Sequence, residues 1–182
     1  MKETAILVID LQNGMLDDGE AVFRKDDLIR NVKMILDAAR KRKYPVIMIQ
    51  HSGKKGDTLE PGTKGWAIYD TFLSKDSETV IHKNYPDAFY ETDLDMVLKS
   101  EGIKNLIICG MQSELCVDST CRDAFAHGYK ITLASDGHST YDRKNIRAEQ
   151  IVELENSVLG EWFGTVDTSE HLASLLDGKK LP

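Results

Sequence analysis

Short apolar runs alternate along this chain with longer amphipathic segments, and this alternation constrains the fold more than any other feature. The runs AILVID (5–10), PVIMIQ (45–50), TVIHK (79–83), NLIICG (105–110) and KITLAS (130–135) are typical of strands buried on both faces, and GTVDT (164–168) is a candidate sixth strand. Strands that alternate with helices predict a parallel sheet covered on both faces. The expected fold class is therefore α/β.

The segments between these runs repeat apolar residues at helical spacing. The chain is expected to be helical over 28–43, 93–103, 113–127, 145–162 and 169–176, with Ser113 as an N-cap and Gly128 just past the end of its helix. Only residues 51–77 are irregular over a long stretch. Connections of that length inside a compact domain are usually functional.

Size and charge limit what such a chain can do. Its 182 residues are 41% hydrophobic and suit one domain over 1–182 with a sizeable core. The net charge of −7 argues against nucleic acid or an anionic membrane as the main partner, because both require basic patches. No apolar run approaches the roughly 20 residues of a membrane span. The N-terminal MKETAILVIDLQ is interpreted as a first strand rather than a signal peptide.

Three chemically active residues fall at the carboxyl ends of predicted strands, which is where open α/β sheets place their sites. Asp10 closes the first strand, Lys83 closes the third, and Cys116 follows the fourth within a few residues. An acid, a cation and a thiol therefore converge on one edge of one sheet. A structural Asp–Lys pair with a buried thiol is the plainer alternative, since cysteine is among the most buried residue types.

The three cysteines are expected to differ in reactivity. Cys109 lies inside an apolar strand and Cys121 lies in mid-helix, so both are expected to pack in the core. Cys116 would be the third residue of a helix capped by Ser113. There the helix dipole and unpaired backbone N–H groups are expected to lower its thiol pKa. No CxxC pair is present, and the close spacing does not indicate a secreted disulfide framework, so a cytoplasmic protein with reduced thiols is expected.

Three segments together resemble the isochorismatase-like cysteine hydrolases, a family that includes nicotinamidases, N-carbamoylsarcosine amidases, streptothricin hydrolase-like enzymes and isochorismatases. These segments are ILVIDLQNGM, VIHKNYPDAFYETDL and LIICGMQSELCVDSTCRDAFAHGYKITLASDGHST, which cover the chain from Ala5 to about Thr140. The G-x-x-[ST]-x-x-C-V form at Gly110–Val117 is the most specific part. The resemblance implies a three-layer α/β/α fold with a six-stranded parallel sheet.

The same resemblance implies a catalytic triad of Asp10, Lys83 and Cys116. Cys116 would attack a carbonyl carbon, with Asp10 as the proton acceptor and donor and Lys83 as the cation that favours thiolate. The family places two oxyanion donors at backbone N–H groups, here those of Gln112 and Cys116. It also has a cis peptide at the position that corresponds to Met111–Gln112.

Five further residues are candidates for the substrate pocket. The motif LEPGTKGWAIYDTF resembles a loop of many family members, and its Trp66 could wall the pocket or pack against the sheet or a neighbouring subunit. Gln12, Leu16 and Tyr85 are candidates because they lie near the triad segments, and His51 because it closes the second strand.

No metal and no other cofactor is expected. Nicotinamidases bind a metal through Asp-x-His at the end of the second strand, whereas this chain reads Ile49-Gln50-His51. An apolar residue cannot be a ligand, and a zinc or iron site requires about three close ligands. Asp57 and Glu60 of the long loop could join His51, so a metal site there stays open as the less favoured alternative. His138 also falls near the carboxyl edge, while the remaining histidines do not.

The expected function is metal-independent hydrolysis of an amide, lactam or ureido bond in a small molecule. Two alternatives remain open: hydrolysis of an isochorismate-like vinyl ether, and a non-catalytic redox or ligand-binding module on the same fold. The family resemblance also implies a homo-oligomer, a dimer or tetramer, for which Trp66, Trp162 and Phe163 could supply apolar contact surface.

Overall fold

A six-stranded parallel sheet forms the centre of the molecule, which we describe from a computed structural model for residues 3–17, 19–74 and 78–178. The strands are β1 (Thr4–Ile9), β2 (Val46–His51), β3 (Thr79–Lys83), β4 (Asn105–Met111), β5 (Lys130–Ser139) and β6 (Thr165–Asp167). Their order across the sheet is β3-β2-β1-β4-β5-β6, and every pairing is parallel. This is the predicted α/β/α class, with the sixth strand present.

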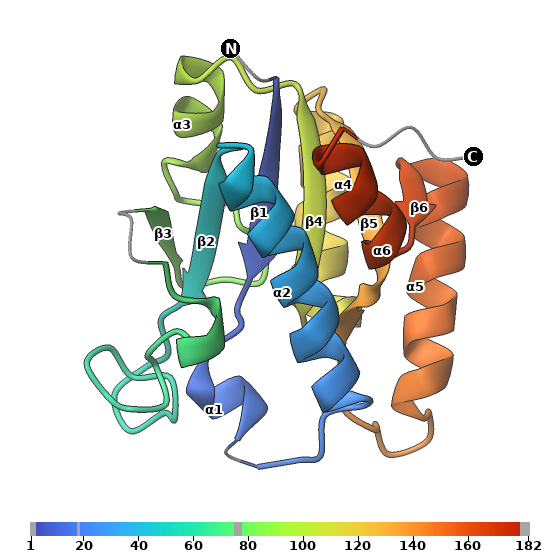
Figure 1. Cartoon of the computed structure of the whole chain (residues 1–182). Coiled ribbons are helices and arrows are strands. Elements are labelled where there is room, and N and C mark those ends of the chain that lie inside the picture. The colour runs from blue at the N-terminus through green and yellow to red at the C-terminus, as the bar shows by residue number, and fades with distance from the viewer. Residues whose placement is uncertain (1–2, 18, 75–77, 179–182) are drawn as a thin grey trace.

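Helices cover both faces of this sheet (Figure 1). They are α1 (Asn13–Leu16), α2 (Lys25–Lys41), α3 (Leu94–Ser100), α4 (Asp118–Ala126), α5 (Ala148–Trp162) and α6 (Ser169–Leu176). Two short helical turns, η1 (Asp70–Phe72) and η2 (Ser113–Val117), complete the elements. Among the described residues, no helix combines the length and apolar character that a membrane crossing requires.

The alternation of side chains along β1 divides the core in two. Ile6 and Val8 pack in one cluster with α2 and α6, whereas Leu7 and Ile9 pack in a second cluster with α3, α4 and α5. Side chains of successive strand residues point to opposite faces, so a strand between two helical layers must be apolar throughout. This is why the AILVI run contains no polar residue.

The long connection between β2 and β3 takes the place of a crossover helix. Adjacent parallel strands can be joined only by a chain that crosses a face of the sheet. Here only η1 is helical, and its Phe72 is fully buried in the cluster beneath α2. The predicted irregular region is therefore a loop with one packed anchor.

The strand order places a topological switch point between β1 and β4. From β1 the chain proceeds through β2 to β3 on one side, and from β4 through β5 to β6 on the other. In open α/β sheets, ligands bind outside the carboxyl ends of the strands at such a point. Asp10 follows β1 directly and η2 follows β4 directly, so both flank this crevice.

Candidate active site

Gly110 allows β4 to approach β1 closely at the crevice. Its φ is +132°, and a Cβ there would lie 2.1 Å from the carbonyl oxygen of Ile9. Only glycine fits this position, because any side chain would collide with backbone. The glycine of the sequence motif thus sets the spacing between the two strands that carry Asp10 and η2.

The backbone reverses direction at Asp10. This residue has φ 51°, in the left-handed region that non-glycine residues rarely adopt, and its side chain is 1% exposed. Its N–H donates to the carbonyl of Ile49 at 3.0 Å, and its own carbonyl accepts from the Gln12 N–H at 3.0 Å. A strained backbone of this kind is common where a side chain must be aimed.

Lys83 joins the carboxylate and the thiol. Its ammonium Nζ lies 2.6 Å from Asp10 Oδ2 and 3.2 Å from Cys116 Sγ, and it also donates to the Tyr85 carbonyl at 3.1 Å. The side chain reaches past the end of β2 from the edge strand β3 and is fully buried. The structure therefore brings the three predicted triad residues together at one point.

Electrostatics favour a charged pair beside a neutral thiol. Burial lowers the pKa of Lys83, but the charges of Asp10 and Cys116 act more strongly together and raise it above its ordinary value. Burial and the Asp10 carboxylate raise the pKa of the Cys116 thiol to about 12, although Lys83 acts in the opposite direction. The expected lowering of this pKa is therefore wrong, because burial and the neighbouring Asp10 carboxylate raise it.

The turn that carries Cys116 differs from the predicted capped helix. Helical geometry begins at Ser113 itself, Gln112 takes the N-cap position, and the first turn is π-helical. The Gln112 carbonyl accepts from the N–H groups of both Leu115 and Val117, at 3.1 Å each. In an α-helix this carbonyl would accept from the Cys116 N–H instead. The peptide between Met111 and Gln112 is cis.

The other two thiols pack in the core, one on each face of the sheet. Cys109 belongs to the cluster under α2 and Cys121 to the cluster under α4, whereas Cys116 is half-buried. Burial raises the pKa of both core thiols. Of the three thiols, only that of Cys116 combines partial exposure with a neighbouring carboxylate and ammonium.

Two of the five pocket candidates have structural positions instead. Leu16 is buried in the cluster beneath α2 with core residues of β1. Gln12 is fully buried, and its amide bonds the backbone three times: it donates to the carbonyls of His51 (2.9 Å) and Trp66 (2.7 Å) and accepts from the His51 N–H (2.9 Å). Such an amide has no donor left for a substrate. Gln12 fixes the ends of β1, β2 and the long loop relative to one another.

Trp66 packs against the sheet edge. Its ring stacks on His82 at 5.3 Å between centroids, and its Nε1 donates to Ser52 Oγ at 3.3 Å. His82 precedes Lys83 on β3 and therefore lies on the opposite face of that strand. Packing on the sheet, one of the positions predicted for Trp66, is observed.

His51 and Tyr85 remain beside the triad. His51 is half-buried, its Nδ1 has no hydrogen-bond partner, and burial together with the Lys83 charge lowers the pKa of its imidazole. Tyr85 is 44% exposed and packs edge-on against Tyr90. His51 Nδ1 is thus a buried nitrogen without a hydrogen-bond partner, next to the strand end that carries Lys83.

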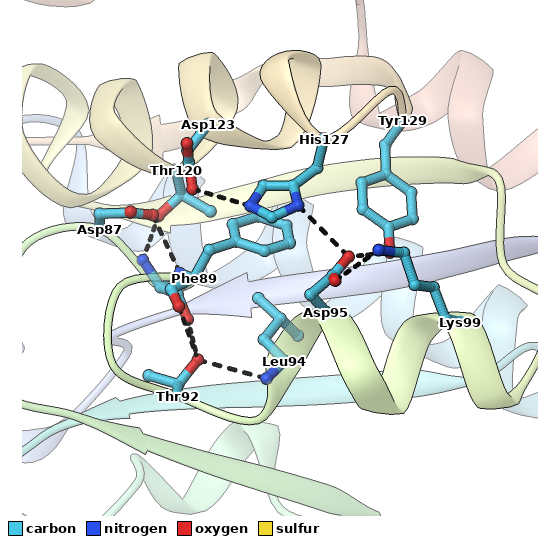
Figure 2. Close-up of polar contacts among 11 residues, drawn as sticks. Asp87, Phe89, Thr92, Leu94, Asp95, Lys99, Thr120, Asp123, His127 and Tyr129 are labelled. Carbon is cyan, nitrogen blue, oxygen red and sulfur yellow. Dashed lines mark hydrogen bonds and ion pairs between the residues drawn. The ribbon is translucent and has the colours of Figure 1, made fainter.

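The loop after Lys83 is held by a polar network on α3 and α4 (Figure 2). The Thr120 hydroxyl accepts from the Ala88 N–H at 3.1 Å, and the His127 ring lies between the carboxylates of Asp95 and Asp123, at 3.4 Å from each. The Ala88–Thr120 bond ties the segment after Lys83 to α4, and the His127 contacts join the end of α4 to α3. Figure 2 also shows the contacts of Asp87, Phe89, Thr92, Leu94, Lys99 and Tyr129.

Metal ligands do not gather in the described part of the chain. No group of three His, Cys, Asp or Glu side chains there could hold an ion. His138, the second histidine near this edge, uses both ring nitrogens in hydrogen bonds to Ser113 and Asn156. Ile49, which precedes His51 by two residues on β2, is buried in the core.

Two contacts of the Cys116 turn were not predicted. Arg143 donates to Gln112 Oε1 at 2.6 Å and forms an ion pair with Glu114, so it clamps the turn from outside. Ser113, expected as a helix cap, bonds His138 within the protein. No local pattern links these residues, because the partners lie on β5 and on the segment after it.

Comparison with known proteins places this arrangement in a family. The sequence profile of the Isochorismatase domain matches residues 4–167. The chain belongs to the isochorismatase family. The isochorismatase family protein YddQ of Bacillus subtilis is 34% identical over 174 residues, which cover 92% of this chain and 97% of that protein.

Two further relatives extend the likeness. The ureidoacrylate amidohydrolase RutB of Agrobacterium fabrum is 29% identical, with 91% of this chain and 86% of that enzyme covered. The crystal structure of an isochorismatase from Pseudomonas putida superposes with a TM-score of 0.88 at 31% identity, over 93% of this chain and 89% of that one. The chain is thus an isochorismatase-family hydrolase with amidohydrolase relatives.

Proposed function

We propose that this protein is a cysteine hydrolase that cleaves the C–N bond of a small amide, lactam or ureido compound without a metal ion. The observation that carries the proposal is the buried Lys83 ammonium, which contacts both the Asp10 carboxylate and the Cys116 sulfur. Likeness to an amidohydrolase supports the choice of bond.

The first half-reaction forms a thioester. Cys116 Sγ attacks the carbonyl carbon while its proton passes to Asp10, whose Oδ1 has no other hydrogen-bond partner among the described residues. Because burial and the Asp10 carboxylate raise the pKa of the thiol, the resting thiol is protonated and its proton passes to Asp10 as the sulfur attacks. Collapse of the tetrahedral adduct breaks the C–N bond, and Asp10 returns the proton to the departing nitrogen.

The second half-reaction regenerates the thiol. A water molecule gives its proton to Asp10 and adds to the thioester carbon, and the carboxylic acid (carbamic acid for a ureido substrate) then leaves from sulfur, which takes the proton back. Lys83 remains charged throughout and stabilises the sulfur anion as it forms or departs.

Two backbone N–H groups are suited to stabilise the oxyanion of both adducts. The Gln112 carbonyl accepts hydrogen bonds from the N–H groups of Leu115 and Val117, so the Cys116 N–H does not donate to it. The Gln112 N–H, on the cis peptide before the turn, is the second proposed donor. Loss of one such donor typically costs on the order of 10²–10³ in kcat.

A hydrolysis screen tests the proposal. We expect turnover of at least one small amide, lactam or ureido compound by the wild-type protein and none by Cys116→Ala. Cys109→Ala and Cys121→Ala, which truncate buried thiols, should change stability more than rate. If folded Cys121→Ala were as inactive as Cys116→Ala, the assignment of the nucleophile would be wrong. Isochorismate belongs in the same panel, since its cleavage alone would identify a vinyl-ether hydrolase.

A further inference from the structure

A buried chain of hydrogen bonds connects the Cys116 turn to β5 and α5. Ser113 Oγ lies 2.8 Å from His138 Nδ1, and His138 Nε2 lies 3.1 Å from Asn156 Oδ1. Asn156 Nδ2 then donates to the Ser135 carbonyl at 3.0 Å. Ser113 is fully buried and His138 is 3% exposed, so water cannot substitute for these partners. The proposed reaction uses none of these three side chains.

The chemistry of the last residue fixes the direction of every bond. A backbone carbonyl can only accept, so Asn156 must present its NH₂ to Ser135 and its Oδ1 to the imidazole. His138 Nε2 therefore carries the hydrogen. Burial lowers the pKa of His138 and keeps the ring neutral, which leaves Nδ1 without a hydrogen. The Ser113 hydroxyl is then the donor to His138.

An irregularity in β5 brings His138 to this place. Ile108 pairs with Leu133 and Gly110 with His138, so two steps along β4 correspond to five along β5. The extra residues let β5 continue to Ser139, whereas the sequence pattern predicted its end at Ser135. His138 thereby stands beside Gly110, at the end of β4 from which the turn begins.

Ser113 is positioned to control both proposed oxyanion donors. It follows Gln112 directly and is the first residue of the turn that ends in Cys116 and Val117. Arg143 holds the turn from outside through Gln112 Oε1, and His138 holds it from inside through Ser113. A shift of the turn by a few tenths of an ångström would misalign both N–H groups without moving Lys83 or Asp10.

We propose that Ser113, His138 and Asn156 are positioning residues whose hydrogen-bond chain sets the oxyanion-binding geometry of the Gln112–Cys116 turn. Their loss should weaken tetrahedral adducts at Cys116 and leave the intrinsic reactivity of its thiol unchanged. This inference rests on the proposed function only in taking the turn as the oxyanion site.

Two probes separate these effects. Reversible addition of [1-¹³C]acetaldehyde to Cys116 forms a hemithioacetal: the S–C bond forms, the C=O π bond breaks, and the thiol proton ends on the new oxygen. Its dissociation constant, followed by ¹³C NMR, reports how well the N–H groups of the turn hold the oxygen of a tetrahedral adduct. The rate of alkylation by iodoacetamide reports the thiol alone, because that displacement forms no tetrahedral adduct with an oxygen for the turn to bind. Cys116→Ala gives the background for both.

For Ser113→Ala we expect roughly tenfold weaker acetaldehyde binding, below the full loss of an oxyanion donor, and an alkylation rate within about twofold of wild type. Ser113→Thr retains the hydroxyl and should restore binding. Asn156→Ala, which leaves Ser113 in place, should weaken binding in the same sense. Ser169→Ala removes a buried hydroxyl that has no hydrogen-bond partner among the described residues and should change neither readout.

The inference would be overturned if folded Ser113→Ala and Asn156→Ala bound acetaldehyde with affinities within about twofold of wild type. Equal loss of alkylation and adduct formation would do so too, since it would indicate general damage to the site. Wild-type protein that forms no adduct would remove the turn as an oxyanion site, and the inference with it. Amide turnover by that same protein would still leave the hydrolase proposal standing.

Discussion

Replacing Lys83 by Met should destabilise the protein far more than an ordinary loss of an ion pair. The Lys83 ammonium is buried 2.6 Å from an Asp10 carboxylate that is itself 1% exposed. Methionine retains most of the side-chain volume, so the change chiefly leaves a buried carboxylate without its cation. Removing one partner of a buried pair costs about 3–5 kcal/mol. For a chain of this length, that corresponds to a fall in Tm of roughly 6–20 °C.

A double-mutant cycle identifies the source of this cost. Asp10→Asn removes the charge that Lys83→Met leaves behind, so the double variant should be more stable than Lys83→Met alone. The matched control is Lys33→Met, the same substitution in an exposed pair with Asp37 on α2, which should cost less than about 0.5 kcal/mol.

Urea unfolding followed by circular dichroism at pH 7 provides the four free energies of the cycle. A cost of less than about 1 kcal/mol for Lys83→Met would refute the reasoning, because the carboxylate would then have another way to be stabilised. A double variant no more stable than Lys83→Met would also refute it, since lost packing rather than an uncompensated charge would explain the effect.

Four other outcomes are expected. The rate of Cys116 alkylation should rise about tenfold per pH unit from pH 7 to 10, because only the thiolate reacts and the thiol pKa is about 12; a plateau near neutral pH would contradict this. Thr120→Val removes the acceptor of the Ala88 N–H and should lower the free energy of unfolding by about 1–3 kcal/mol in urea denaturation; an unchanged value would show that the bond is dispensable. Turnover should survive exhaustive chelation, and stoichiometric zinc, iron or manganese bound through His51, with activity lost on its removal, would defeat the metal-free mechanism. Solution scattering at micromolar concentration should give the mass of a dimer or tetramer, with the 69%-exposed Trp162 as a contact candidate; a monomeric mass would exclude this association.

The sequence was sufficient for the sheet and for the convergence of the triad. Strands buried on both faces must be apolar throughout, so their runs stand out, and Thr79–Lys83 has the predicted bounds. The carboxyl ends of parallel strands meet at one edge, which is why Asp10, Lys83 and Cys116 could be placed together before any coordinates. Neither inference depends on the detailed shape of a loop.

Local sequence patterns did not predict side-chain contacts that depend on residues far away in the chain. A serine before an amphipathic run usually caps a helix, but a buried imidazole from β5 takes the Ser113 hydroxyl instead. Leu16 and Gln12 lie near Asp10 in the chain, but both follow the left-handed turn at that residue. Leu16 packs in the core, and Gln12 bonds the backbone of the long loop. Proximity to Asp10 in the sequence therefore did not predict what these two side chains contact.

The raised pKa of the Cys116 thiol favours the proposed hydrolase over a redox sensor on this fold. Redox-sensing cysteines are oxidised readily because they are accessible thiolates near neutral pH. Cys116 has the opposite character: burial and the Asp10 carboxylate keep it protonated, and it is only half-exposed. A neutral thiol beside a carboxylate becomes nucleophilic when an electrophilic carbon is bound and its proton can pass to Asp10 during attack. The ammonium of Lys83 makes this transfer feasible by stabilising the sulfur as it becomes anionic. A thiol in this environment favours reaction with a bound carbonyl compound over reaction with oxidants in solution, which is the selectivity that the proposed cysteine hydrolase requires.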